Sequence, residues 1–309
     1  MKAFKSILAA MCAVLAVSLA GCSGQSGSTA SSAAPSEAGS TVSAASEADS
    51  KPESTEKDSP ASSSAVSDSA PEEKSLSGKC GENAFYALSD DDVLTISGSG
   101  DMYDYGSEEG KFTPWHKEYY KSVVIENGIT RIGDYAFYHG DVQEITIPDS
   151  VTAVGKYAFA RWSQTETISL PDSVETIEEG AFSGSTFHTL RIPEKVKAIP
   201  AKMMEACREL TEIALPEGVE TIGDNSFESC ESLSKVTLPE TLTEIGAYCF
   251  GSCWAVTEVT IPASVTTIGR DAFFVWEDGQ TIYVKGKTEA PSGWHDDWRS
   301  DEVKVVWNV

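Results

Sequence analysis

The stretch VTLPETLTEIGAYCF at residues 236–250 is nearly repeated by VTIPASVTTIGRDAF at residues 259–273. The same pattern recurs earlier in the chain, and a proline after an isoleucine or leucine marks the same point of each unit at intervals of 22 or 23 residues. A period of this length is typical of proteins built from stacked repeats. The marking residues are Pro148, Pro171, Pro193, Pro216, Pro239 and Pro262, and Glu126 takes this place one unit earlier.

Each unit opens with an alternating triplet, such as VTI at 259–261. The two-residue period predicts a short strand with its outer side chains in a core, and the proline ends the strand because it has no N–H to donate. A second apolar step follows at Val265 and Ile268, and a turn glycine, here Gly269, closes it. One unit cannot bury its own apolar face, so neighbouring units must stack. The position eleven residues after the mark is bulky and apolar in all seven units: Phe137, Phe159, Phe182, Met204, Phe227, Phe250 and Phe273.

The unit pattern I-x-I-P-x-x-V-x-x-I-G-x-x-A-F-x-x-C, seen as VTLPETLTEIGAYCFGSC at 236–253, resembles the BspA-type, or treponemal, leucine-rich repeat. The segment 78–105, followed by Pro114 and Trp115, is similar to the β-rich N-terminal cap of such proteins. The resemblance implies an α/β, β-rich leucine-rich-repeat solenoid, a horseshoe-like stack of 22–23-residue repeats with a small β N-terminal cap. It also implies a surface-exposed protein that binds proteins or host cells and lacks catalysis.

Two units depart from the pattern. Glu178 and Pro200 replace the turn glycine, and the unit at 190–212 carries Met203 and Met204 where the others have a small residue and Phe. We expect the unit at 190–212 to be the loosest of the stack.

The first 22 residues, MKAFKSILAAMCAVLAVSLAGC, have the layout of a secretory signal. Lys2 and Lys5 precede an apolar run, and the last four residues, LAGC, resemble a bacterial lipobox. That resemblance implies a signal peptide at 1–21, lipidation of Cys22 and a lipid anchor on the extracytoplasmic face of the cell membrane. An ordinary signal peptide or a short transmembrane anchor is the alternative.

Residues 22–78 are dominated by Ser, Ala and Glu, and Val42 and Val66 are the only aliphatic residues larger than Ala before residue 76. Such a segment cannot bury enough apolar surface to offset the entropy of ordering. We expect a disordered tether; a recognition tail is the alternative.

The stack needs a cap at each end, because a terminal repeat otherwise leaves an open edge and a bare core. At the N-terminal end, 79–121, strands are expected at 83–88 and 93–98, joined by an acidic turn for which calcium binding is the less favoured interpretation. Seven repeats follow at 122–281. The C-terminal cap is expected at 282–309, where Trp294, Trp298 and Trp307 form a lid or, alternatively, an aromatic ligand site.

Three cysteines invite a catalytic interpretation, but their spacing opposes it. Cys207, Cys230 and Cys253 all lie fourteen residues after their marking proline, so they are predicted to form a buried column of free thiols. With Cys80 and Cys249 they make an odd total in the folded region, against a complete disulfide framework. No zinc spacing, phosphate loop or nucleophile elbow is present. We therefore expect no enzyme, no metal and no cofactor.

Charge narrows the function classes further. With 48 acidic and 23 basic residues the chain has a net charge of −25, which repels phosphate backbones, so nucleic acid is not an expected partner. We expect a monomeric binding or adhesion module for a protein or glycan partner at the cell surface, such as a host or matrix protein. An envelope glycan-binding or scaffold protein is the alternative. An envelope enzyme or solute-binding lipoprotein is less favoured, because a stack of short coils does not readily form a cleft.

The expected binding surface is the exposed side of the strands that open the units. The middle residues of the triplets and the residues two places before them should form two parallel columns, polar and mostly uncharged. A polar face of this kind fits a weak, extended contact; the simpler explanation is that Ser and Thr suit exposed strands. The residues chosen as candidates are Glu144, Thr146, Arg191, Glu212, Lys235, Thr237, Glu258, Thr260 and Tyr283.

Overall fold

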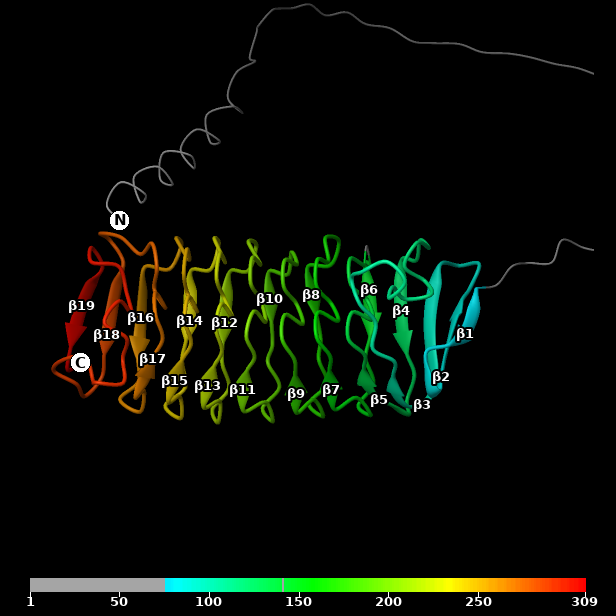
Figure 1. Ribbon diagram of the computed structural model, residues 1–309, viewed down its shortest axis with the longest axis horizontal. Coiled ribbons are helices and arrows are strands. Elements are labelled where there is room, and N and C mark those ends of the chain that lie inside the picture. Colours follow the sequence, from blue (N-terminus) through cyan, green and yellow to red (C-terminus); the bar gives the residue numbers. More distant parts are fainter. Residues whose placement is uncertain (1–75, 141) are drawn as a thin grey trace, which may run out of the picture. The chain divides into compact units, whose positions relative to one another are not determined.

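The computed structural model describes residues 76–140 and 142–309. The expected signal peptide, Cys22 and nearly all of the expected tether lie outside these residues. The described residues form nineteen strands and no helix, and the strands follow one another in a single row of coils (Figure 1). The predicted leucine-rich-repeat solenoid is confirmed. The fold class of the described residues is β, where α/β was expected, because the segments that return the chain between strands are turns and not helices.

The predicted strands form at the triplets, each beginning one residue earlier, and they stack in parallel as a first ladder. Strands β8 and β10 end after the first residue of their triplets. Neighbouring strands are in register, for example Val236 beside Ile213. The ladder is interrupted between β6 and β8 and between β14 and β16. Its strands are β4 (Ser122–Ile125), β6 (Glu144–Thr146), β8 (Thr167–Ile168), β10 (Thr189–Leu190), β12 (Glu212–Ala214), β14 (Lys235–Thr237), β16 (Glu258–Ile261) and β18 (Thr281–Val284).

The second apolar step of each unit is also a strand, and these strands form a second parallel ladder below the first in Figure 1. The sequence pattern marked the apolar residues but not the pairing, because two residues are too few to show an alternation. The strands are β5 (Ile129–Ile132), β7 (Ala153–Val154), β9 (Thr176–Ile177), β11 (Ala198–Ile199), β13 (Thr221–Ile222), β15 (Glu244–Ile245) and β17 (Thr267–Ile268).

A third set of hydrogen bonds joins the coils along the turns that follow the second strands, here called the turn side. In the first six coils, the ninth, eleventh and thirteenth residues after the marking position donate their N–H groups to the next coil, as Tyr157 does to Glu179 at 3.0 Å and Phe159 to Ala181 at 2.8 Å. In the seventh coil, Asp271 and Phe273 donate to Asp297 and Trp298 of the C-terminal end. The ninth and thirteenth residues have φ between 51° and 69° in every coil. Such a backbone costs a non-glycine residue roughly 1–2 kcal/mol, so the bonds between coils must hold it in place.

The aromatic column predicted eleven residues after each mark fills the core. Phe137, Phe159 and Phe182 stack with centroid distances of 5.7 Å at each step, and Phe227 and Phe250 stack at 5.4 Å. All are fully buried, as is Met204, which interrupts the stacked rings. Burying each such side chain contributes roughly 1.5–3 kcal/mol.

The glycine after the second strand permits close approach between coils. A Cβ on Gly246 would lie 2.5 Å from the backbone N of Asp224 in the preceding coil, and one on Gly269 would lie 2.4 Å from that of Ala247. Neither glycine has a positive φ. The sequence-based interpretation as a turn glycine was therefore incomplete, because the constraint is the spacing of the backbones.

Pro200 interrupts the second ladder in the unit expected to be loosest. In the following coils the N–H at this position donates to the preceding coil, as Gly223 does to Ile199 at 2.8 Å. Pro200 has no N–H, and β9 and β11 are not paired among the described strands. The turn side stays bonded there, since Gly180 donates to Ala201 at 3.0 Å. The looseness of the unit remains a prediction.

At the N-terminal end, three strands cover the first coil: β1 (Ser77–Lys79), β2 (Gly81–Leu88) and β3 (Val93–Met102). The hairpin of β2 and β3 agrees with the predicted strands and extends beyond them. Strand β3 pairs with both β4 and β5, so it covers the ends of both ladders.

At the C-terminal end, β19 (Lys304–Trp307) pairs with β18. Trp298 packs edge-on against Phe273 at 5.8 Å, and Trp294 contacts both Trp298 and the half-buried Trp307. The three tryptophans thus lie over the end of the core.

Candidate functional site

The strand face, defined as the exposed side of the first ladder, carries eight of the nine candidate residues within its strands, and Arg191 directly follows β10. Glu212 lies beside Lys235 and Thr260 beside Tyr283, because parallel strands in register place equivalent positions next to each other. Glu212 and Tyr283 are half-buried, and the other seven are exposed. The two interruptions of the ladder separate Thr146 from the column beyond it and Lys235 from Glu258. The geometry of two polar columns is as predicted; a role in binding remains a prediction.

Ion pairs use part of the charge on this face. Lys235 bonds to the Glu212 carboxylate, and Arg191 bonds to Asp172 at 2.6 Å. Both pairs are exposed, and exposed pairs contribute little to stability. Glu144 and Glu258 form no ion pair with the described residues. The face therefore offers separated charges and hydroxyl groups, with Tyr283 as its one aromatic candidate.

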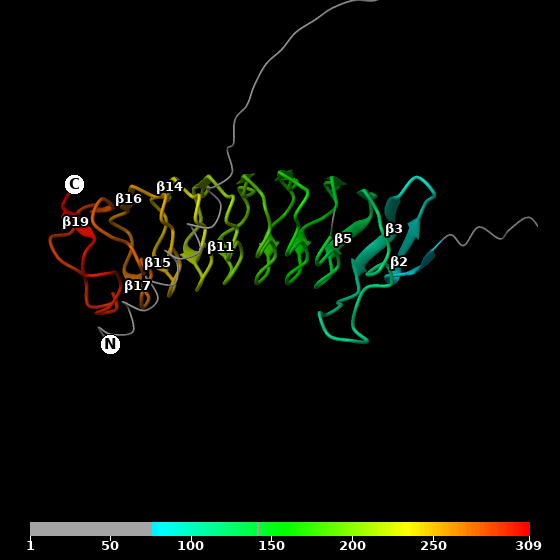
Figure 2. The ribbon, with the colours of Figure 1, turned by 90° about the horizontal axis from the view of Figure 1, so that it is seen from above.

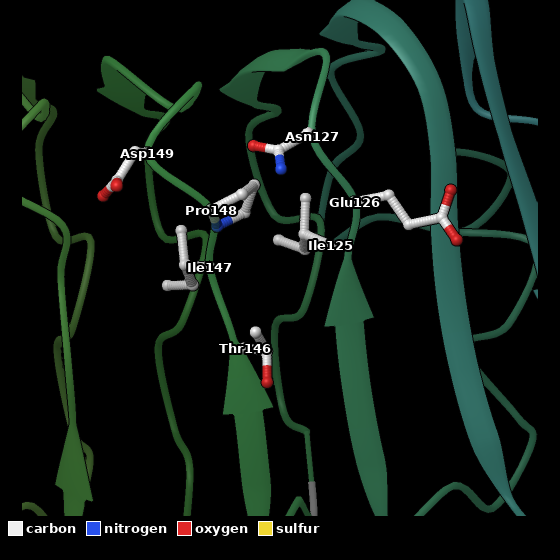
Figure 3. Close-up of a pocket in the computed structure, with 7 residues that line it drawn as sticks. All are labelled: Ile125, Glu126, Asn127, Thr146, Ile147, Pro148 and Asp149. Carbon is white, nitrogen blue, oxygen red and sulfur yellow. The ribbon is translucent and has the colours of Figure 1, made fainter.

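A shallow, open groove of about 670 Å³ lies where strands β4 and β6 end (Figure 3). Ile125 and Ile147 provide apolar surface, while Glu126 and Asp149 carry carboxylates beside it. Thr146 of the strand face also lines the groove. Apart from Thr146, the groove residues were not among the predicted site residues; the replacement of the marking proline by Glu126 was the sequence signal available.

The three column cysteines are buried and free, as predicted. Burial raises the pKa of the Cys207 and Cys253 thiols to about 12 and that of Cys230 well above its usual value. The thiols are therefore protonated at neutral pH, and a buried protonated thiol is a poor nucleophile.

Each of these thiols donates a hydrogen bond to the carbonyl of the bulky core residue in the coil before it. Cys207 bonds to Phe182 at 3.1 Å and Cys253 to Phe227 at 3.2 Å. Other side chains at the same position make the same bond: Trp162 to Phe137 at 2.7 Å, Ser185 to Phe159 at 2.9 Å and Trp276 to Phe250 at 2.8 Å. The column is thus a series of donors inside the core.

The described residues include no cluster of three or more His, Cys, Asp or Glu side chains suited to holding a metal ion. Within the same ranges, no helix has the length and apolar character needed to cross a bilayer. The exposed polar columns and the open groove can bind a partner through hydrogen bonds and charge.

The fold and this site define a β-solenoid of leucine-rich-repeat type with an exposed strand face. The chain belongs to the BspA type leucine rich repeat family, whose repeat model matches residues 115–204 and 152–278 with six copies. Repeats of this family commonly mediate binding and typically serve as non-catalytic scaffolds. No curated protein matches the sequence.

Solved structures of bacterial proteins share the fold. A leucine-rich repeat protein from Eubacterium ventriosum is 24% identical with a TM-score of 0.54, over 68% of this chain and 66% of that chain, just under two thirds of its length. A leucine-rich repeat protein from Bacteroides ovatus is 18% identical with a TM-score of 0.52, over 74% of this chain and 70% of that one.

Proposed function

We propose that this protein is a non-catalytic, lipid-anchored surface module that binds a protein partner, such as a host or matrix protein, along its strand face. The observation that carries the proposal is the pair of in-register polar columns, in which Lys235 and Thr237 lie beside Glu212 and Ala214 across hydrogen-bonded strands. These side chains project from a backbone held by its neighbours, so little backbone entropy is lost on contact. Membership in a family whose repeats commonly bind partners supports the same reading.

The face is suited to a weak and extended contact. It lacks a dense cluster of Trp, Tyr and Arg, the residues that dominate tight interfaces. Many lipid-anchored copies on one cell could raise a weak affinity through avidity, provided that Cys22 is lipidated and residues 22–78 act as a tether. An envelope glycan-binding or scaffold protein is the second candidate, with the same anchor and the same face.

The test reverses charges on the strand face while preserving its ion pair. A triple variant with Glu212→Lys, Lys235→Glu and Glu258→Lys keeps opposite charges at the first two positions, which lie side by side. The comparison variant reverses Glu228, Glu231 and Arg270, which lie outside the strands of the first ladder. Binding of the full chain to immobilised matrix proteins, to epithelial cells and to wall polysaccharide is measured.

We expect the strand variant to lose at least ten-fold in binding and the comparison variant to keep it. If the comparison variant abolishes binding while the strand variant retains it, the strand face is not the binding surface. Retained binding to wall polysaccharide with no binding to proteins would favour the second candidate.

A further inference from the structure

The turn side of the first two coils carries an aromatic cluster, here called the tyrosine patch: Tyr135, Tyr138, His139, Tyr157 and Arg161. Tyr135 stacks on Tyr157 with centroids 5.1 Å apart, and it meets Tyr138 edge-on at 5.3 Å. The Arg161 guanidinium lies over the Tyr138 ring at 5.9 Å, and His139 is edge-on to the same ring. The tyrosines are half-buried, and His139 and Arg161 are exposed.

The patch is held in place by the repeat itself. Tyr157 lies over Gly180 of the next coil so closely that a Cβ there would be 2.2 Å from its ring. The Tyr157 hydroxyl lies 3.4 Å from a carboxylate oxygen of Glu179. The rings therefore form a preorganised platform, which lowers the entropic cost of binding.

A small pocket of about 80 Å³ adjoins the patch. One side consists of His116, Glu118 and Tyr119 from the loop between β3 and β4, which projects from the row of coils (Figure 2), and the other includes Tyr138 and His139. Tyr119 is 63% exposed. The pocket has room for a polar substituent and is lined by hydrogen-bonding groups of both kinds.

The charges around the patch are mixed. Arg161 and Lys156 form no ion pair with the described residues, although the chain has 48 acidic residues. Glu118 supplies a carboxylate in the pocket, and Glu179 is paired with Lys202 at 3.2 Å. A free guanidinium beside aromatic rings can bind a carboxylate in bidentate fashion, while Glu118 can accept hydrogen bonds from hydroxyl groups.

We propose that the tyrosine patch and its pocket bind an acidic saccharide, meaning a glycan whose sugar rings carry carboxyl groups. The positively polarised C–H face of a pyranose ring packs on the negative face of Tyr135 or Tyr138, whereas the Tyr157 ring lies between Tyr135 and Gly180 and supports the platform. Arg161 pairs with the carboxylate, and Glu118 and His139 bond to ring hydroxyls or their substituents in and beside the pocket.

A saccharide fits this surface better than a protein does. A stable protein interface buries about 800 Å² per partner around an apolar core. The patch presents flat rings with polar tips and contains no aliphatic side chain. This binding site goes beyond the proposed function, because it lies on the turn side and shares no residue with the strand face.

The test is calorimetric titration of the full chain with tetragalacturonate and, as the neutral counterpart, with galactotetraose. We expect tetragalacturonate to bind at least ten-fold more tightly. Arg161→Gln should remove this preference, and Tyr157→Leu, which removes the ring that supports Tyr135, should weaken both ligands at least ten-fold. Tyr138→Leu should do the same and provides a second variant if Tyr157→Leu does not fold.

The matched control is Tyr248→Leu, since Tyr248 occupies in the sixth coil the repeat position of Tyr157 and lies outside the patch. It should leave titrations unchanged, as should the charge reversals on the strand face, so the two proposals can fail independently. The proposal is overturned by absence of tetragalacturonate binding, by equal losses in Tyr157→Leu and Tyr248→Leu, or by patch variants that impair only binding to a protein.

Discussion

The position fourteen residues after each marking proline holds unrelated side chains that all make the same hydrogen bond. Trp162, Ser185 and Cys207 differ in size and polarity, yet each donates to the core residue of the preceding coil. Equal spacing in the sequence was enough to predict an interior column. The reason for its composition was not predictable, because the accepting carbonyl belongs to another unit.

Replacing Cys230 tests the donor role. Cys230→Ala removes one of two hydrogen bonds that the Met204 carbonyl accepts, because the Cys207 N–H still donates to it at 3.1 Å, and a single hydrogen bond contributes about 0.5–1.5 kcal/mol. Cys230→Ser keeps a donor, as Ser185 does naturally, and should cost less. Urea unfolding measures both; equal losses for the two variants would contradict a donor role.

Glu205 on the turn side is expected to make stability depend on pH. Burial and the neighbouring Glu228 raise the pKa of Glu205 in the folded protein. Because the pKa of Glu205 is higher in the folded than in the unfolded protein, protonated Glu205 favours the folded state. This contribution to stability is fully present below the pKa of the unfolded state and is lost as the pH rises through the pKa of the folded state. Glu205→Gln should therefore raise the melting temperature at pH 7 and have little effect near pH 4.

The control for this prediction is Glu217→Gln, at an exposed position outside the turn side. It should leave the melting temperature unchanged at both pH values. A gain for Glu205→Gln that is the same at pH 4 and pH 7 would exclude ionisation of Glu205 as the cause.

At the scale of the elements, the first ladder was predictable and the turn side was not. Triplets such as 259–261 show the strand period, and the marking prolines show where strands stop. On the turn side, Tyr157, Lys202 and Val275 adopt positive φ, which nothing in these residue types indicates. Gly180 and Gly184, which occupy both positions in one coil, were the available signal.

The same limit applies to the candidate sites. The columns of the strand face follow from period and register, so their residues could be chosen from the sequence alone. The tyrosine patch depends on Tyr157 lying over Gly180 and on a distant loop that carries Tyr119. These contacts join separate coils and the cap through the turn-side geometry, which the sequence does not show.

The spacing of the coils can be tested with two glycines of one unit. Gly246→Ala places a Cβ within 2.5 Å of the preceding backbone and should cost at least 1–3 kcal/mol, as overpacking does. Gly251→Ala should cost much less, because its Cβ would be no closer than 3.3 Å to a neighbour. Thermal unfolding measures both, and similar losses would show that coil spacing does not depend on Gly246.

At the scale of the whole molecule, the proposed function needs an anchor at one end of a long tether. Cys22→Ala should abolish labelling by a fatty-acid probe and leave the precursor uncleaved before residue 22, because the thioether that carries the lipid cannot form. Gel analysis of metabolically labelled cells measures both effects. A chain that is still labelled and cleaved after this substitution would contradict the anchor; Cys12→Ala is the matched control.

The hydrogen bonds of the turn side join backbone groups of neighbouring coils, so they do not depend on which side chains the coils carry. On the turn side, each of the first six coils offers the next coil the same three donors, and the next coil accepts through equivalent carbonyls, so these turn-side joints are equivalent. A gene that gained or lost 23 codons in register by unequal recombination would still encode matching joints. Lineages can therefore change the length of the stack one unit at a time, while the caps at its ends stay the same.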